Sequence, residues 1–377
     1  MIRSKTSLTT LLLTLCCGMP SAIVAQNVDS LYWDNPFGIP GANGGIVASV
    51  VGADSNLYVG GHFTQIGDTL ANRVAMWDGE KWSSLGPGLN SAVLALAADV
   101  SGNLYAGGFF TTDGDGTPLG TYGRIAKWDG SSWSAMGDGF KHDVQALKFE
   151  GSGIGTPGEC LYEVGGLFFS FGGEDSLNRW CAGSWSSLGA GVGTRLADLE
   201  FNFFGDLYVA GSFTTIGDGS NDTTANNVAL FGPGKWQPLG DGVNAAAYAL
   251  EFRSTPGPDT LWVGGDFNSA GGVPTENVAA WNFASWSSAG IPNSVEIRDL
   301  HSGPDGNLWA GGQFPRAGFG PIGNVGRRSG SSWILDEVST IGVVYSLAMG
   351  PDSLLYFGGF FDLVYQPAGT DAVGAKA

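Results

Sequence analysis

Short apolar runs that end in a pair of glycines recur along the whole chain. The clearest run reads Leu-Tyr-x-Gly-Gly, and in most copies a Phe follows two residues after the last glycine. Runs that are this short, apolar and bounded by glycine are typical of β-strands rather than helices. Seven versions occur, at residues 57–61, 104–108, 161–166, 207–211, 261–265, 308–312 and 355–359.

A tryptophan keeps the same period between these runs. The spacings are 49, 51, 52, 51, 50 and 47 residues. Periods of about 40–50 residues with several strands in each unit are the sequence signature of propeller blades. The tryptophans are Trp33, Trp82, Trp133, Trp185, Trp236, Trp286 and Trp333.

Each repeat divides into four expected strands. The first is apolar, as in 93–96, and the glycine-pair run is the second. The third and fourth resemble 73–77 and 81–85, joined by the hairpin dipeptide Asp78-Gly79. A single four-stranded sheet cannot bury both of its faces, so blades stack around an axis. We expect the glycine pair to let neighbouring backbones approach closely, and Trp and Phe to fill the wider outer part of each wedge.

The sequence therefore predicts an all-β fold: a seven-bladed β-propeller with four-stranded antiparallel blades. The segment 31–33 matches a fourth strand, whereas the last repeat stops after its second strand and a tail, 371–374, that weakly matches a third. We expect the N-terminal strand to close the last blade, because closure removes open sheet edges. An open array of repeats is the alternative.

The first 26 residues have the order of a secretory signal peptide. Arg3 and Lys5 precede an apolar stretch, 8–17, and a segment of small residues, 21–26. We expect cleavage after residue 26, one propeller domain over 27–377, and a secreted or cell-surface location. An apolar N-terminal strand is the alternative, and no later segment is apolar enough to predict an integral membrane segment in the mature chain.

The composition and net charge limit the classes of partner that we expect. The 377 residues include 63 Gly, yet 43% are hydrophobic, which is enough apolar surface for a core. The chain has 17 basic and 35 acidic residues, for a net charge of −18. A surface this acidic repels phosphate backbones, so we expect no nucleic-acid partner. We also expect a monomer.

The phrases around the second repeat resemble a known family. The segment 93–108, with the phrases Ala-x-Trp-Asp-Gly and Trp-Ser-x-x-Gly around it, resembles the delta-sixty type of propeller repeat. That family occurs in exported bacterial proteins and, more distantly, in fungal cortical marker proteins, and its architecture is related to the kelch and galactose-oxidase propellers. The resemblance implies a propeller over essentially all of the mature chain. It implies no catalytic residues, because the family shares none.

Two cysteines, Cys160 and Cys181, remain after the expected signal peptide. They lie in one repeat, on segments that we expect to be neighbouring strands, and an exported protein can oxidise them. The sequence leaves open a disulfide and two separate buried thiols. No Cys-x-x-Cys or paired-His pattern accompanies them, so no metal site is predicted.

The histidines do not form a catalytic pattern. His62, His142 and His301 fall at three different positions of three repeats, so they need not meet. The sequence leaves the question of catalysis open and favours a protein that is not an enzyme.

Carboxylates at two kinds of position are the candidate ligand-binding groups. The small position of the first strand, which we align as Ser49, Ala95, Ala146, Ala249 and Ser346, is acidic in two repeats. Other acids lie in the glycine-rich loops between second and third strands. The candidates are Asp68, Asp113, Asp115, Glu174, Asp198, Asp218 and Asp299. No cofactor is predicted; calcium at 113–116 is an alternative, although that segment lacks the later acidic ligands of a calcium loop.

The loops between second and third strands are expected to share one face with the connections between blades. They are long in the second repeat (111–123) and the fourth (214–226), and the residue after the glycine pair differs between repeats. Variable loops on a rigid scaffold are common recognition surfaces. We therefore predict an exported, non-catalytic binding or scaffold module for an extracellular protein or glycan. The alternative is a polysaccharide lyase or hydrolase with acidic residues at the channel mouth.

Overall fold

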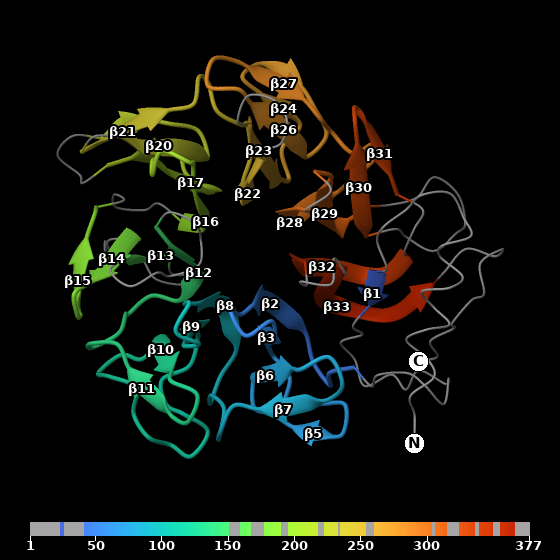
Figure 1. Cartoon of the computed structure of the whole chain (residues 1–377). Helices are drawn as coiled ribbons and strands as arrows, with labels where there is room; N and C mark the ends of the chain where they lie inside the picture. Colours follow the sequence, from blue (N-terminus) through green and yellow to red (C-terminus); the bar gives the residue numbers. More distant parts are fainter. Residues whose placement is uncertain are drawn as a thin grey trace.

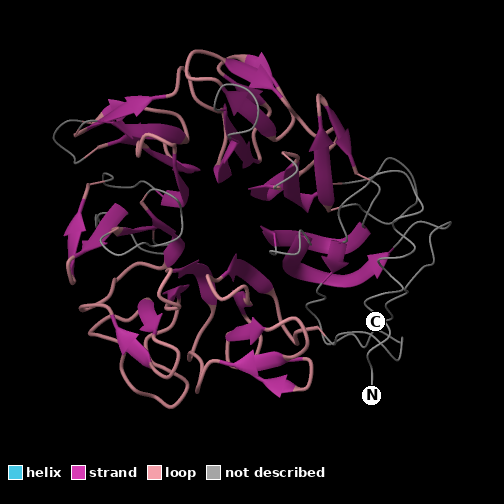
Figure 2. Cartoon of the chain, viewed as in Figure 1, coloured by secondary structure: helices cyan, strands magenta, loops and turns pink. Residues whose placement is uncertain are grey.

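A computed structural model describes most of the chain. The described residues are 23–25, 41–150, 159–166, 177–189, 195–217, 222–232, 234–253, 260–303, 306–314, 324–335, 339–349 and 355–365. All regular elements in these ranges are strands (Figure 2). Within the same ranges, no helix is long and apolar enough to cross a membrane.

Six four-stranded antiparallel sheets are arranged as blades around a central axis (Figure 1). In each blade the chain runs outward from the axis, one strand after the next. Blades one to three are β2 (Ile46–Val51), β3 (Leu57–Gly61), β6 (Val74–Trp77) and β7 (Trp82–Ser84); β8 (Val93–Ala98), β9 (Leu104–Gly108), β10 (Ile125–Trp128) and β11 (Trp133–Ala135); and β12 (Val144–Phe149), β13 (Leu161–Gly165), β14 (Leu177–Cys181) and β15 (Ser184–Ser187). Blades four to six are β16 (Arg195–Phe201), β17 (Leu207–Ser212), β20 (Val228–Gly232) and β21 (Lys235–Pro238); β22 (Ala247–Arg253), β23 (Thr260–Gly265), β26 (Val278–Trp281) and β27 (Trp286–Ser288); and β28 (Glu296–Ser302), β29 (Leu308–Gln313), β30 (Val325–Ser329) and β31 (Ser332–Ile334).

Smaller sheets complete the described structure. Three two-stranded ribbons lie in the loops between second and third strands: β4 (Gln65–Ile66) with β5 (Thr69–Leu70), β18 (Thr215–Ile216) with β19 (Thr223–Thr224), and β24 (Ser269–Ala270) with β25 (Val273–Pro274). A three-stranded sheet lies between blades six and one, in the order β1 (Ile23–Ala25), β33 (Leu355–Tyr365), β32 (Ser339–Met349).

The prediction of seven four-stranded blades is wrong, because the described structure has six. The seventh repeat supplies only the hairpin of β32 and β33. Its third strand is β1, which pairs with β33 in parallel, with Ile23 opposite Leu355. The predicted closing strand around Trp33 lies outside the described residues. β1 falls within the segment 1–26 that is expected to be a cleaved signal peptide, and that expectation stays a prediction.

The glycine pairs bring neighbouring blades into contact, as expected from the sequence. A Cβ on the first glycine, Gly107, would lie 2.2 Å from Cγ1 of Val144 on the next blade. A Cβ on the second glycine, Gly108, would lie 2.2 Å from the carbonyl oxygen of Ala92, beside the first strand of the same blade. The contact made by the first glycine also closes the ring, since a Cβ on Gly358 of β33 would lie 2.5 Å from Cγ2 of Ile46 in blade one.

The periodic tryptophans connect blades two to six, each to the blade before it, whereas the indole nitrogen of Trp82 in blade one has no such bond. In blade two, the indole Nε1 of Trp133 donates a 3.0 Å hydrogen bond to the carbonyl oxygen of Leu85. Four more blades repeat the bond, through Trp185 to Met136, Trp236 to Gly189, Trp286 to Leu239 and Trp333 to Ala289. Because these carbonyl groups lie between blades, the bonds satisfy acceptors that no sheet ladder reaches.

The loops between second and third strands share a face with the connections between blades. In blade one, the Oδ1 atom of Asn43 accepts hydrogen bonds from the backbone N–H groups of Thr64 and Gln65. Asn90 does the same for Thr111 and Thr112. We call this side of the ring the loop face. The opposite side carries the tight turns that join first to second and third to fourth strands, and we call it the turn face.

Candidate functional site

The innermost strand of every repeat contains a β-bulge. Pairing with the second strand shifts between Ile46 and Ala48 in β2, and between the equivalent residues in the other six strands. A bulge leaves one residue out of the ladder and can redirect its side chain. We call the seven skipped residues the bulge ring: Val47, Leu94, Gln145, Ala197, Tyr248, Arg298 and Tyr345.

The residue that follows each bulge is the small position predicted from the sequence. It is Ala95 in blade two, and the two acidic members, Asp198 and Asp299, belong to blades four and six. In blade one the position is Ala48, so the alignment of Ser49 with this ring was wrong by one residue. Ser49 instead forms a 2.8 Å hydrogen bond between its hydroxyl group and that of Ser346, across the gap between the first and last repeats.

Residues of these two rings, with Ser49, Leu96 and Leu147, line an open cavity of about 200 Å³ in the central channel. It lies near the start of the innermost strands, and therefore toward the loop face. Its wall is not uniform. Blades one and two contribute apolar groups, including Val47 and Leu94, whereas blades five and six and the three-stranded sheet contribute Tyr248, Arg298 and Tyr345.

Arg298 lies between two tyrosines of the bulge ring. The centre of its guanidinium group is 4.3 Å from the centroid of the Tyr248 ring and 5.3 Å from that of Tyr345. A cation held over aromatic faces is attracted by their negative surfaces. Its Nη2 atom also forms an ion pair with Glu296. The Tyr248 hydroxyl group donates a 3.3 Å hydrogen bond to Asp266, the residue after the glycine pair of blade five.

Asp198 and Asp299 line the same cavity and also join neighbouring blades. The Oδ2 atom of Asp198 accepts a 2.7 Å hydrogen bond from the N–H of Leu250 in blade five. The Oδ2 atom of Asp299 accepts a 2.6 Å bond from the N–H of Leu347 in β32. Burial raises the pKa of each carboxyl group to about 7, against the effect of these backbone donors. Each aspartate is therefore a link between blades as well as part of the cavity wall.

A second set of charged groups lies two residues further along the innermost strands. Lys148 and Glu200 form an ion pair between blades three and four. Burial alone would lower the pKa of Lys148, but the attraction of Glu200, then of Glu251, raises it. Burial, followed by repulsion from Glu200, raises the pKa of Glu251 to about 8, and its Oε1 atom accepts a 2.7 Å bond from Ser302 N–H. Burial lowers the pKa of His301 to about 4, so this imidazole is neutral at pH 7.

Burial raises the pKa values of Asp198 and Asp299 alike, to about 7, so both carboxyl groups can exchange protons near neutral pH. The cavity offers hydrogen-bond donors, acceptors and aromatic groups around a small space.

The predicted loop acids that the structure describes, Asp68, Asp113 and Asp115, do not line this cavity. Asp68 is exposed in the turn between β4 and β5. Asp113 closes its own loop, because its Oδ1 atom accepts hydrogen bonds from the N–H groups of Asp115 and Thr117. Glu174 and Asp218 lie outside the described residues. In the part of the chain that the structure describes, no group of three or more His, Cys, Asp or Glu residues could hold a metal ion. Calcium binding stays a prediction.

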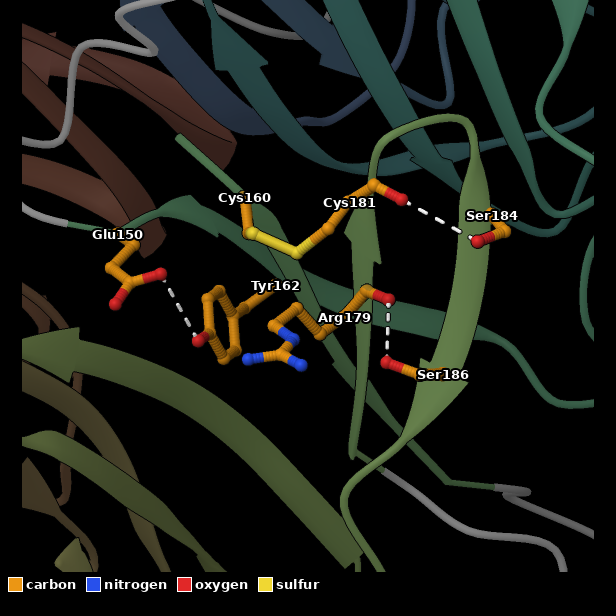
Figure 3. Close-up of a disulfide and its surroundings, with 7 residues drawn as sticks. All are labelled: Glu150, Cys160, Tyr162, Arg179, Cys181, Ser184 and Ser186. Carbon is orange, nitrogen blue, oxygen red and sulfur yellow. Dashed lines mark hydrogen bonds between the residues drawn. A yellow bond between two sulfur atoms is a disulfide. The ribbon is translucent and has the colours of Figure 1, made fainter. Parts of the chain in front are cut away.

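Cys160 and Cys181 form a disulfide in blade three (Figure 3). Cys160 directly precedes β13 and Cys181 ends β14, and their Cα atoms are 4.8 Å apart. Beside them, the Tyr162 hydroxyl group donates a 3.3 Å hydrogen bond to Glu150 (Figure 3). The disulfide therefore joins neighbouring strands of one blade and lies apart from the channel cavity.

The sequence analysis missed the basic and aromatic members of the bulge ring. Tyr248 and Arg298 each directly precede the small position of a first strand, so the repeat alignment already contained them. A regular strand would point successive side chains to opposite faces, which would place these residues between blades. Only the bulge explains why they line the cavity with their neighbours.

Comparisons with known proteins agree with the fold. No family model matches the chain. The extracellular domain of a B. thetaiotaomicron protein assigned as a hybrid two-component system aligns with a TM-score of 0.53 at 11% identity, over 90% of this chain and 39% of that one. YCF48 bound to D1 peptide aligns with a TM-score of 0.51 at 13% identity, over 84% of this chain and 91% of that one. The chain is therefore a β-propeller.

A curated sequence is similar to one segment of the chain. Polarized growth protein L1 of Phoma sp. (strain ATCC 20986 / MF5453) is 39% identical over 88 residues. The match spans 21% of this chain and 6% of that protein. The delta-sixty resemblance stays a prediction.

Proposed function

We propose that this propeller is an exported binding module that holds an extracellular protein or glycan at the loop face, over the mouth of the central channel. The bulge ring carries this proposal. Its seven residues occupy equivalent backbone positions, yet they range from Val47 and Ala197 to Tyr248 and Arg298. A fixed frame that presents different side chains around one cavity is suited to recognising an asymmetric ligand.

The expected export and the solved neighbours support the setting. The signal-peptide pattern over 1–26 supports a location outside the cytoplasm. One structural neighbour is an extracellular domain, and another is a propeller bound to a peptide. Loops on the same face, such as that of β18 and β19, would enlarge the contact around the cavity.

Binding to extracellular material tests the proposal. The full chain is purified and added to intact cells and to matrix extracted from the source organism. Three portions of the matrix are compared: untreated, digested with protease, and oxidised with periodate. We expect saturable binding that one treatment removes and that Tyr248→Ala weakens at least tenfold, about 1.4 kcal/mol. Phe203→Ser, at an exposed position of the turn face, is the matched control and should bind as the wild type does. Absence of saturable binding would contradict the proposal.

A second candidate function follows from Asp198 and Asp299 lining one cavity. Two carboxylates near one substrate are the usual apparatus of glycoside hydrolysis. A polysaccharide lyase or hydrolase would release new reducing ends or unsaturated products from a polysaccharide mixture, and Asp198→Asn or Asp299→Asn would abolish the release. If binding is absent and turnover present, this candidate replaces the first.

A further inference from the structure

The chemistry of the channel cavity narrows the class of ligand, provided that the proposed binding function holds. We infer that the cavity binds one neutral sugar residue, at the end or along the side of a glycan chain. Its size, its hydrogen-bonding groups and its charge all lead to this class.

Size limits the occupant to a small unit. Pockets that enclose a whole drug-sized ligand are usually about 300–1,000 Å³. The channel cavity is about 200 Å³. It therefore accepts a single ring or side chain, while the rest of the ligand lies over the loop face.

The polar groups match hydroxyl groups, which both donate and accept hydrogen bonds. Arg298 offers donors only, Asp198 and Asp299 offer acceptors when ionised, and Gln145 and Tyr248 offer both. These groups come from blades three to six, so they meet the occupant from four successive blades. A polyol can use such a mixture of donors and acceptors, whereas a simple ion uses groups of one kind.

The opposite wall is apolar. Val47, Ala48, Leu94, Ala95 and Leu96 form most of the side contributed by blades one and two, together with Ser49. A sugar ring presents C–H groups on its faces and hydroxyl groups at its edge. Its face can pack on this wall while its edge points to Arg298 and Gln145.

Charge argues against an acidic occupant. Arg298 is the basic residue among those that line the cavity, and it already pairs with Glu296. Arg195, at the start of β16, lies near Arg298 and is attracted by Asp143. Deeper in the channel, Lys148 pairs with Glu200. A phosphate, sulfate or uronate would therefore approach Asp198 and Asp299 without an uncommitted cation in the wall, and desolvating such an anion is unfavourable.

The experiment uses defined probes and the full chain. Immobilised neutral oligosaccharides (gluco-, xylo-, manno- and galacto-oligomers) are compared with oligo-uronates and with a lysine-rich peptide. We expect saturable binding to at least one neutral series and none to the uronates. Gln145→Leu keeps the approximate size of the side chain and removes its polar groups. Arg298→Lys keeps the positive charge and removes the planar guanidinium group with its several N–H donors. Each should weaken binding by roughly tenfold.

Controls separate the cavity from other surfaces and from misfolding. Phe203 and Phe204 are 89% and 78% exposed on the turn face, so Phe203→Ser with Phe204→Ser tests binding by exposed aromatic rings elsewhere. This double variant should bind as the wild type does, and all variants should keep the wild-type circular dichroism spectrum and unfolding midpoint within about 3 °C.

Several outcomes would overturn the inference. They are an absence of binding to every neutral series, binding to the lysine-rich peptide alone, or neutral-sugar binding that is lost with Phe203 and Phe204 but kept in Gln145→Leu and Arg298→Lys. If the chain binds no oligosaccharide but still binds protease-sensitive matrix in a Tyr248-dependent way, the sugar inference fails and the proposed binding function stands. If neither form of binding is found, both fail.

Discussion

The outer parts of the blades and the wall of the channel follow opposite rules. In the outer parts, residues at equivalent positions make the same contacts in successive blades. Trp133 donates its indole hydrogen bond to the preceding blade, and Trp286 does so again three blades later, to Leu239 at 2.7 Å. Next to each of these tryptophans lies another, with ring centroids 5.5 Å apart for Trp128–Trp133 and 5.2 Å for Trp281–Trp286.

The channel wall keeps its backbone but changes its side chains. The bulge recurs in every innermost strand, yet its residue is Val47 in blade one and Arg298 in blade six. The repeated residues therefore specify the propeller frame. The chemistry of the channel depends on a few positions whose side chains differ between repeats. Mutations in the two regions should therefore have different consequences: loss of stability in the outer frame, and loss of binding or of pH response in the channel.

The largest loss of stability is expected when the disulfide of blade three is removed. The disulfide spans 21 residues between Cys160 and Cys181. Replacing both cysteines by Ala should lower the free energy of unfolding by about 3 kcal/mol, because the unfolded chain regains the freedom of that loop. Chemical denaturation checks the value. Reduction of the wild-type protein should give the same loss, and an unchanged midpoint would show that the bond is absent in solution.

A somewhat smaller loss is expected at the contact between blades. Gly107→Ala places a Cβ atom 2.2 Å from Val144, so the blades must separate, at a cost of about 1–3 kcal/mol. Gly79→Ala is the matched control, because no atom lies within 4 Å of its Cβ position although its φ is +94°. Denaturation of both variants separates crowding from backbone strain. An unchanged free energy of unfolding in Gly107→Ala would contradict close packing between the blades.

The indole hydrogen bond should contribute less than the packing. Trp133→Phe removes the indole hydrogen bond to the carbonyl oxygen of Leu85, which keeps its bond from the N–H of Gly88, and should lower stability by about 1 kcal/mol. Trp128→Phe in the same blade removes a neighbouring indole that makes no such bond to the preceding blade. The frame predicts a larger fall in the unfolding midpoint for Trp133→Phe than for Trp128→Phe, and the reverse order would refute the role of the bond.

The smallest effect is a pH dependence that belongs to the channel. Since burial raises the pKa values of Asp198 and Asp299 to about 7 in the folded state, the folded protein binds more protons than the unfolded chain between pH 4 and pH 7. Stability from these groups is therefore present below pH 4 and is lost as pH rises through 7. Glu251, with a pKa of about 8, extends this loss of stability to higher pH. His301, whose pKa is lowered from 6.5 to about 4, adds stability as the pH rises from 4 to 6.5 and so opposes the loss in that range.

The double variant Asp198→Asn with Asp299→Asn isolates this contribution. Its unfolding midpoint should fall less between pH 5 and pH 8 than that of the wild type, while Lys148, Glu200, Glu251 and His301 remain in both proteins. The slope is the measured quantity, because an asparagine nitrogen cannot accept the N–H bonds of Leu250 and Leu347 and so lowers stability at every pH. Equal slopes would show that the two aspartates do not titrate in this range.

Much of the frame could be predicted from the sequence because its residues repeat. Glycine pairs such as Gly107-Gly108 and tryptophans such as Trp133 mark the second and fourth strands of most blades. The number of complete blades could not, because the seventh repeat has only β32 and β33 and its third strand is the parallel β1. The segment around Trp33 was matched to a fourth strand by its side chains alone. So short a segment does not show whether it would pair in parallel or antiparallel.

The site was predicted in part. Asp198 and Asp299 stand out in sequence because acids replace small residues at one repeat position, and the structure places both on the cavity wall. Tyr248 and Arg298 were missed because strict alternation would direct them away from the channel, and the bulge breaks that alternation. Asp113 closes a turn of its own loop, and the sequence alone does not separate Asp-Gly chemistry that closes a turn from chemistry that binds a cation.

One triple variant tests the division between frame and channel most directly. Gln145→Leu, Tyr248→Leu and Tyr345→Leu give the polar side of the bulge ring the apolar character that Leu94 has in blade two. Binding to extracellular material and the denaturation midpoint are measured on the same preparation. The account predicts a folded propeller with a midpoint close to that of the wild type and binding reduced by more than tenfold. A folded variant that binds as tightly as the wild type would contradict it.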